Sequence, residues 1–196
     1  MLRMRLGVLA ISAVALVQIA SAEPALRVLF IGNSFTVQSI PDVFKRLAMD
    51  AGWQPPVVTN AAVVSQTLEW HRSNAPTLAA VDQGNWDYVV LQEYSTRPTD
   101  NPAVINANPL KFKEDVTWFY DRIKATSPNA QIILFETWAR HENNNYYPTY
   151  YANRDTMQAQ LNYHYHDAAE NYIPANATYP VKTDVALAPV GEAWAI

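Results

Sequence analysis

The 196-residue chain contains no cysteine. This absence excludes disulfide bonds, thiolate zinc sites, a cysteine nucleophile and a lipidated cysteine. Charged residues are also sparse, at 16% of the chain, and the formal net charge is −4. A chain of this composition has no basic surplus for nucleic-acid binding, and no nucleic-acid partner is expected. Its length fits a single domain with a sizeable core.

Long hydrophobic runs are scarce, and the one at the N-terminus is short for a membrane span. Arg3 and Arg5 precede an apolar run over 6–19, and Ala-Ser-Ala follows at 20–22. A basic start, an apolar centre and a small-x-small end are typical of a secretory signal peptide. We therefore expect residues 1–22 to be a signal peptide and residues 23–196 to form the domain. The protein would be secreted or periplasmic, without stable membrane insertion after cleavage; an uncleaved anchor is the alternative.

Short apolar runs alternate with segments of helical periodicity, and there is no internal repeat. Strands are expected at 28–31, 56–59, 86–93, 131–138 and 185–190. Helices are expected at 41–49, 67–71 continuing toward 81, 112–123 and 156–172. This alternation predicts a three-layer α/β/α sandwich around a flavodoxin-like parallel sheet of order 2-1-3-4-5.

Polar residues follow the predicted strands at the points where they end. Gly32-Asn33-Ser34 follows the first strand, Gln92-Glu93 ends the third, and Trp138 ends the fourth. In this fold the carboxyl ends of the strands face one crevice, where ligands bind. A serine there could act as a nucleophile if a base and N–H donors for the oxyanion lie nearby. Taken alone, Gly-Asn-Ser is equally an ordinary turn, and Gln92-Glu93 an ordinary loop start.

Four segments of the chain resemble the SGNH/GDSL hydrolases, in consistent order and over nearly the whole domain. Residues 28–36 (VLFIGNSFT) are similar to block I, in the branch with Gly-Asn-Ser in place of Gly-Asp-Ser. Residues 64–71 resemble the block II region, and 86–95 the block III region, with Leu-Gln-Glu in place of Gly-x-Asn-Asp. Residues 188–194 resemble the segment that precedes block V.

The resemblance implies a serine esterase that needs no metal or organic cofactor. Ser34 would be the nucleophile, and the oxyanion hole would consist of the Ser34 N–H, the Ser65 N–H and the Gln92 side chain. Position 65 is usually glycine in the family. Asn33, Glu93 and Trp138 would bind substrate, with Glu93 orienting Gln92 or contacting the ligand. The expected substrate is a small-molecule or carbohydrate ester, above all a sugar that carries an O-acyl or O-acetyl group. Lipid and thioester substrates are the alternatives.

One element of the family pattern is not found in this sequence. The family's catalytic Asp-x-x-His lies after the last strand, and no such motif follows Trp194. We therefore expect a C-terminally truncated domain without its last helix. Among the histidines, His71 is expected to anchor the block II loop and His141 to reach the crevice rim; neither they nor His164 and His166 are assigned as the base. A non-catalytic carbohydrate-binding or degenerate protein is thus the alternative, and a flavodoxin-like flavin or nucleotide binder is disfavoured because Gly32-Asn33-Ser34 is no glycine-rich phosphate cradle.

Overall fold

The computed structural model describes residues 24–37, 39–180 and 185–194. The predicted signal peptide, residues 1–22, lies outside these described residues. Within them, no helix combines the length and apolar character needed to cross a membrane.

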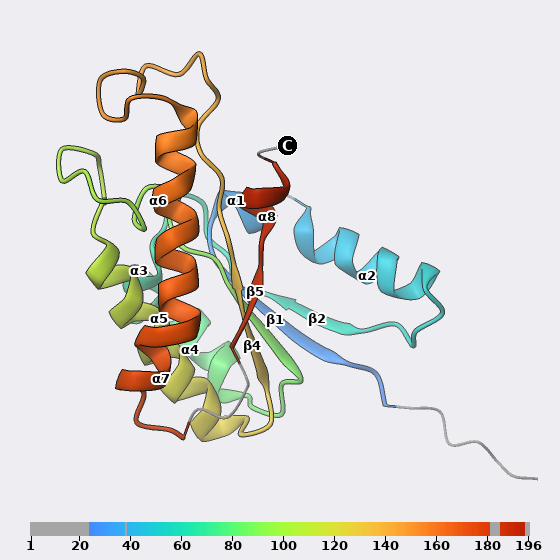
Figure 1. The fold of residues 1–196 in the computed structure, drawn as a ribbon. Coiled ribbons are helices and arrows are strands. Elements are labelled where there is room, and N and C mark those ends of the chain that lie inside the picture. Colours follow the sequence, from blue (N-terminus) through green and yellow to red (C-terminus); the bar gives the residue numbers. More distant parts are fainter. Residues whose placement is uncertain (1–23, 38, 181–184, 195–196) are drawn as a thin grey trace, which may run out of the picture.

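Five parallel strands form one sheet in the order β2-β1-β3-β4-β5 (Figure 1). The strands are β1 (Arg27–Ile31), β2 (Val57–Asn60), β3 (Tyr88–Leu91), β4 (Gln131–Phe135) and β5 (Val185–Ala188). The fold class and strand order predicted from the sequence are confirmed. Ile31 of β1 pairs with Leu91 of β3, so these two central strands end at the same level. The segments that follow Ile31 and Leu91 therefore meet at one edge of the sheet.

Eight α-helices and one π-helical turn are found among the described residues. They are α1 (Ser34–Val37), α2 (Ile40–Asp50), α3 (Leu68–His71), α4 (Ala75–Asp82), α5 (Pro109–Thr126), α6 (Arg154–Asp167), η1 (Ala168–Tyr172), α7 (Ile173–Asn176) and α8 (Val190–Ala193). Asparagine precedes α4, α5 and α6, at positions 74, 108 and 153, and each side chain accepts a backbone N–H from the first turn. Such caps satisfy a donor that the helix itself leaves unpaired, which explains where these three helices begin.

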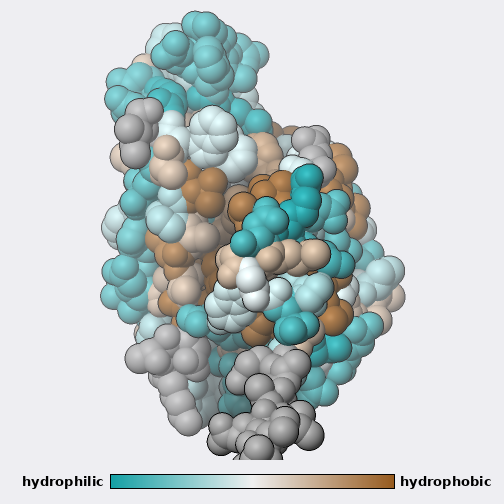
Figure 2. Space-filling model, turned by 90° about the vertical axis from the view of Figure 1, so that its right-hand side faces the viewer, coloured by the Kyte–Doolittle hydropathy of each residue, from teal (hydrophilic) through white to brown (hydrophobic). Residues whose placement is uncertain are grey.

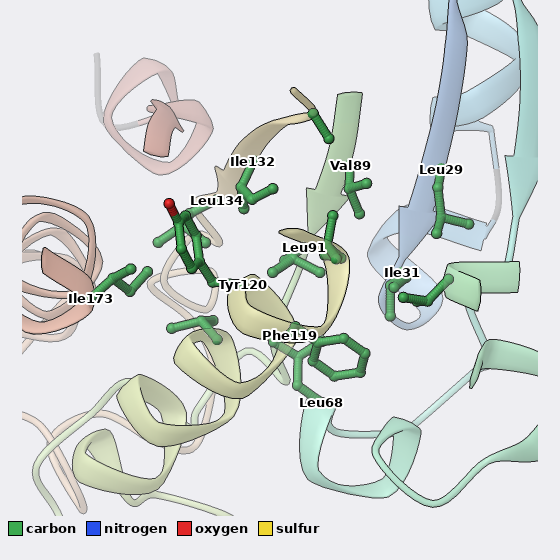
Figure 3. Packing of buried hydrophobic residues seen from close by; sticks show 14 of the residues in the cluster. Leu29, Ile31, Leu68, Val89, Leu91, Phe119, Tyr120, Ile132, Leu134 and Ile173 are labelled. Atoms are coloured by element: carbon green, nitrogen blue, oxygen red, sulfur yellow. The ribbon is translucent and has the colours of Figure 1, made fainter. Parts of the chain in front are cut away.

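The main hydrophobic core lies between the sheet and the layer formed by α3, α4, α5, α6 and α7 (Figures 1 and 3). Alternate strand residues point to this side, as expected from the two-residue period of a strand. Leu29, Ile31, Val89 and Leu91 meet Phe119 of α5 there, and all are essentially inaccessible to solvent (Figure 3). This packing holds the central strands, and hence their polar ends, in a fixed position.

The opposite face of the sheet is covered less completely. Among the described residues, α2 is the one long helix on this side, and it packs through Ile40 and Phe44 (Figure 1). Beside it lies an apolar groove of about 540 Å³, whose walls include Phe30, Tyr88 and Phe135. Figure 2 looks onto this side of the molecule and shows hydrophobic side chains gathered on its surface. The described residues thus leave part of this face open, while the expected loss of the last helix stays a prediction.

The helix predicted over 156–172 differs from the observed one. α6 begins at Arg154, and the helical path continues through η1 and α7 to Asn176. Pro174 lies in the first turn of α7, where a ring without an N–H is tolerated. The wider π turn directly before it carries the chain past the proline, so the helical segment does not stop at Tyr172.

We predict that Leu134→Ala lowers the free energy of unfolding by ~2–5 kcal/mol, because it leaves a cavity in the core beneath the sheet. Leu134 is completely buried, whereas Leu110 at the start of α5 is 53% exposed. The matched variant Leu110→Ala should change the unfolding free energy by less than ~1 kcal/mol. Urea titration followed by circular dichroism compares the two; equal losses would contradict the assignment of the core.

Candidate active site

Ser34 lies in a tight turn that follows β1 directly. The Asn33 carbonyl accepts the N–H groups of Thr36 and Val37, both at 2.9 Å, and this closes the turn. The Asn33 side chain accepts the Phe35 N–H at 3.3 Å and donates to the Gln66 carbonyl at 3.2 Å. Asn33 is therefore almost fully buried and shapes the turn from both ends, while Ser34 keeps part of its surface exposed.

Gly32 allows the turn to approach β3 closely. A Cβ atom at this position would lie 2.7 Å from Gln92 Oε1 and 2.8 Å from Thr36 Oγ1. Both distances are too short for any side chain, so the glycine of the Gly-Asn-Ser segment is required by space. The close approach places Ser34 and Gln92 at the same edge of the sheet.

Gln92 is completely buried and joins β3 to the Ser34 turn. Its Oε1 accepts the Asn33 N–H at 2.9 Å and the Thr36 hydroxyl at 3.0 Å, and its Nε2 donates to the Glu93 carbonyl. Because a backbone N–H can only donate, the Asn33 N–H fixes which end of the amide faces the turn. The amide nitrogen has a second hydrogen besides the one given to Glu93. The oxyanion role predicted for Gln92 remains a prediction, but its position beside the Ser34 turn is observed.

Ser65 lies in the loop that follows β2, and its backbone is in the left-handed region with φ 63°. The Val63 N–H donates to the Gly32 carbonyl at 2.9 Å and ties this loop to the Ser34 turn. A left-handed φ suits glycine better than serine. Within the described residues, neither the Ser34 N–H nor the Ser65 N–H has a hydrogen-bond acceptor. Two donors are therefore available at the turn.

His71 of α3 is fully buried and contacts the Gly32 carbonyl at the start of the Ser34 turn. Its Nε2 lies 2.9 Å from the Gly32 carbonyl and its Nδ1 lies 2.8 Å from Thr77 Oγ1. Because a carbonyl can only accept, Nε2 carries the proton. Burial lowers the pKa of His71 and keeps the ring neutral. The anchoring role expected for His71 matches these contacts.

Glu93 points away from open solvent and is completely buried. Its Oε1 accepts the backbone N–H groups of Leu68 at 3.2 Å and Tyr94 at 2.5 Å, so it fixes the start of α3. Burial raises the pKa of Glu93 to about 7, although these N–H groups and Arg97 act in the opposite direction. The predicted substrate contact gains no support from this placement; Glu93 positions the loop between β2 and α3.

Trp138 and Phe35 form one wall of a cavity of about 510 Å³ next to the Ser34 turn. Their rings are stacked, with centroids 4.4 Å apart and planes 12° from parallel. Trp194, which follows α8, lies 5.8 Å from the Trp138 ring and extends the series outward. We call these three residues the aromatic ladder. The cavity fits the size range of small-molecule sites, ~300–1,000 Å³, and Trp138 lines it as the sequence analysis expected.

A buried Glu136 at the end of β4 supports the Trp138 segment. Glu136 Oε1 accepts from Gln158 Nε2 at 3.2 Å, and Gln158 Oε1 accepts the Ala139 N–H at 2.8 Å. Burial and the nearby Glu192 raise the pKa of Glu136 to about 7. Gly191 of α8 packs so closely on Glu136 that a Cβ would lie 2.7 Å from Oε1. This contact ties α8, and Trp194 after it, to the end of β4.

The four histidines of the chain are all among the described residues. His141 lines the cavity, and its Nδ1 accepts the Asn143 N–H at 3.2 Å. His164 Nε2 lies 2.7 Å from Asp100 Oδ1 and has no hydrogen bond to the described residues of the Ser34 turn. His166 lies between Glu170 and Glu192, at 2.8 Å and 3.1 Å, and these partners raise its pKa. No hydrogen bond joins a histidine to Ser34 Oγ among the residues that the structure describes.

The sequence analysis assigned Trp138 and His141 to the crevice but not the other residues that line the cavity, among them Phe35, Arg140, Arg154 and Trp194. Phe35 directly follows Ser34, so its place beside the predicted nucleophile was an available signal. Arg140 lies in a loop, and Arg154 is the first residue of α6. Only the tertiary structure brings them to the same cavity as Trp194. No local pattern in the sequence indicates it.

Solved structures with the same fold are found among known proteins, although no protein-family profile and no curated protein match the chain. A protein from Slackia heliotrinireducens named as a candidate SGNH hydrolase has a TM-score of 0.63 and 23% identity, covering 88% of this chain and 95% of its own. The chain has the fold of the SGNH hydrolases. The lipase/acylhydrolase of Enterococcus faecalis has a TM-score of 0.57 and 16% identity, covering 87% and 78% of the two chains. A single-residue variant of esterase AlinE4 has a TM-score of 0.53 and 14% identity, covering 86% and 78%.

The left-handed backbone conformation of Ser65 can be tested by substitution. We predict that Ser65→Gly leaves the free energy of unfolding unchanged or raises it by up to ~1 kcal/mol, because φ 63° is unfavourable for a residue with a Cβ. Ser65→Val should lower it by ~1–3 kcal/mol, since a branched side chain suits this φ least. Chemical denaturation of the pair measures the difference, and a more stable valine variant would contradict the assigned backbone.

The buried Glu93 predicts a pH dependence of stability. Its pKa rises from 4.5 to about 7 on folding, so the folded chain holds a proton that the unfolded chain has lost. The free energy of unfolding should therefore fall as pH rises from about 4.5 to about 7, by up to ~3 kcal/mol for this group. Glu93→Gln should flatten that fall, whereas Glu114→Gln, at an exposed position of α5, should not. Urea unfolding midpoints at pH 5 and pH 8 measure the change in stability for the unaltered protein and both variants. An equal change in all three proteins would refute the role of Glu93.

Proposed function

We propose that this protein is a secreted serine esterase of the SGNH type that removes O-acyl groups, acetyl above all, from carbohydrate. The observation that carries the proposal is the Ser34 turn. A partly exposed serine follows the central strand, and it is held by Asn33, Gly32 and Gln92 beside two backbone N–H groups without acceptors. A hydroxyl beside N–H donors for an oxyanion is one part of what acyl transfer requires, and a base for the hydroxyl proton is the other.

In the proposed reaction, Ser34 Oγ attacks the ester carbonyl carbon and a base takes its proton. The N–H groups of Ser34 and Ser65 donate to the oxyanion that forms. Gln92 supports this step by holding the turn, because its Oε1 faces the turn and its Nε2 donates to Glu93. The tetrahedral intermediate collapses, the sugar alcohol leaves with a proton, and the acyl group remains on Ser34. Water then hydrolyses this acyl-enzyme and returns the serine. Every step uses side chains and backbone, and the proposal needs no cofactor.

The lack of a base bonded to Ser34 among the described residues favours a second candidate function. His141 is the histidine that lines the cavity, but its Nδ1 accepts the Asn143 N–H. Within the described residues no hydrogen bond joins its ring to Ser34, so the structure assigns no base. The second candidate is therefore a non-catalytic carbohydrate-binding protein, which would retain the cavity and the oxyanion donors without turnover.

The carbohydrate part of the proposal is supported by the aromatic residues of the cavity. Trp194 is 62% exposed although it is large and apolar, and it adjoins Trp138. An exposed, supported indole offers a flat apolar face for the C–H side of a sugar ring. The predicted signal peptide at 1–22 supports a role outside the cytoplasm, where esterified glycans are available.

We predict that a fluorophosphonate probe modifies the full chain at Ser34 and that Ser34→Ala abolishes both this labelling and p-nitrophenyl acetate hydrolysis. Ser73→Ala, at an exposed serine of the loop after α3, should react like the unaltered protein. Mass-spectrometric mapping of the labelled peptide gives the readout. Modification elsewhere would overturn the role of Ser34, and absence of labelling would favour the binding protein.

A further inference from the structure

Two arginines of the cavity lack a carboxylate partner. Arg140 donates to the Ser95 hydroxyl at 2.8 Å, and Arg154 donates to the Trp194 carbonyl. Neither forms an ion pair with any residue that the structure describes. Carboxylate partners are found instead for the arginines at positions 72, 97 and 122. The two guanidinium groups thus bring uncompensated positive charge into the cavity.

Each of these guanidinium groups keeps donors for a ligand. A guanidinium has five N–H groups in a planar fork, and the contacts above use one donor of each arginine. The Arg140 group is also held over the Tyr146 ring, at 5.8 Å from its centroid. Both side chains are half-buried, so they are held in place and partly shielded from water. A planar, charged fork of this kind matches a carboxylate.

The charge of the cavity differs from that of the chain as a whole. The chain carries a net charge of −4 and repels anions at a distance. Glu142 is the acidic residue among those that line the cavity, against Arg140 and Arg154. The two arginines and the one carboxylate therefore give the cavity walls a net positive charge. A ligand with one carboxylate would balance this excess.

The aromatic ladder lies on the same cavity and is linked to these charges. The carbonyl that accepts from Arg154 belongs to Trp194, the outermost ring of the ladder. The innermost ring belongs to Phe35, the residue after Ser34. A flat apolar surface and a positive charge therefore line one cavity, and the proposed nucleophile directly precedes one of its lining residues, Phe35. A neutral sugar would use the rings alone, whereas a sugar acid would use both features.

The geometry points to a carboxylate-bearing sugar, a uronate residue of an esterified acidic glycan, as the ligand of this cavity. Its ring lies against Trp194 and Trp138, and its carboxylate accepts from Arg140 and Arg154. This assignment deepens the proposed esterase function and rests on it, since the bound uronate positions the ester of the same glycan at Ser34. It names a substrate class that an arrangement of exposed aromatic rings alone would not select.

Binding of two matched disaccharides to the full chain tests the assignment. α-1,4-Digalacturonate and α-1,4-galactobiose differ in the oxidation of C6 only, and calorimetric titration measures both. We expect the unaltered protein to bind digalacturonate at least ~10-fold more tightly, because charge-assisted hydrogen bonds to arginine outweigh neutral ones. High salt should weaken digalacturonate binding more than galactobiose binding.

Variants of the arginines separate charge recognition from structure. Arg140→Gln and Arg154→Gln should each weaken digalacturonate binding about 10-fold and leave galactobiose binding within about 2-fold. Arg46→Gln, at an exposed and unpaired arginine of α2, should change neither. If a substitution only displaced Trp194, it would weaken the binding of both sugars. An equal loss of affinity for both would therefore overturn the proposal. Equal affinity of the unaltered protein for the two sugars, or binding of neither, overturns it as well.

The same titrations with Ser34→Ala keep this proposal separate from the esterase. That variant should retain the preference for digalacturonate, because Ser34 does not contact the carboxylate. Retained preference without Ser34 labelling in the unaltered protein would refute the esterase alone. Ser34 labelling together with equal binding of the two sugars would refute the uronate assignment alone.

Discussion

The site depends on one buried amide, the side chain of Gln92. Its oxygen accepts from the Asn33 backbone and from the Thr36 hydroxyl, so it fixes the turn after β1 to the end of β3. The Gly32 carbonyl provides the second attachment, because it accepts from Val63 and from His71. The turn that carries Ser34 is thus held from two sides. In the proposed reaction, the Ser34 N–H would therefore meet the oxyanion without rearrangement.

Two buried glutamates, Glu93 and Glu136, fix the loops around the turn. Glu93 after β3 holds the start of α3, and Glu136 after β4 contacts Gln158, which holds the Trp138 segment. Each carboxyl group is buried at an unfavourable cost, which its raised pKa reflects. The contacts they make are with backbone or amide groups of neighbouring segments. They therefore specify where each loop lies more than they stabilise the core.

The fold was predictable because its signal is local and periodic: five short apolar runs separated by helical segments. Ser34 and Gln92 were also accessible, since parallel strands that end together place their next residues together. Glu93 was harder, because adjacency to Gln92 says nothing about which side of the strand its carboxyl group takes. Arg154 and Trp194 are 40 residues apart, and their convergence depends on the packing of α8 against α6. Four-residue helices such as α1 and the π turn before Pro174 carry no periodic signal of their own.

The edge strand β5 has a consequence for how the cavity behaves over time. Every residue of β5 is only half-buried, whereas β3 is enclosed over most of its length, and the groove beside α2 leaves this part of the sheet with few apolar neighbours. Local opening begins where burial is least, and amide hydrogen exchange is fastest there. β5 leads into α8 and Trp194, so the outer wall of the cavity is carried by an edge strand that opens more readily than the central strand β3. The inner wall, at Phe35, follows the central strand β1, so we expect the two walls of the cavity to differ in hydrogen exchange, with the Trp194 side exchanging faster.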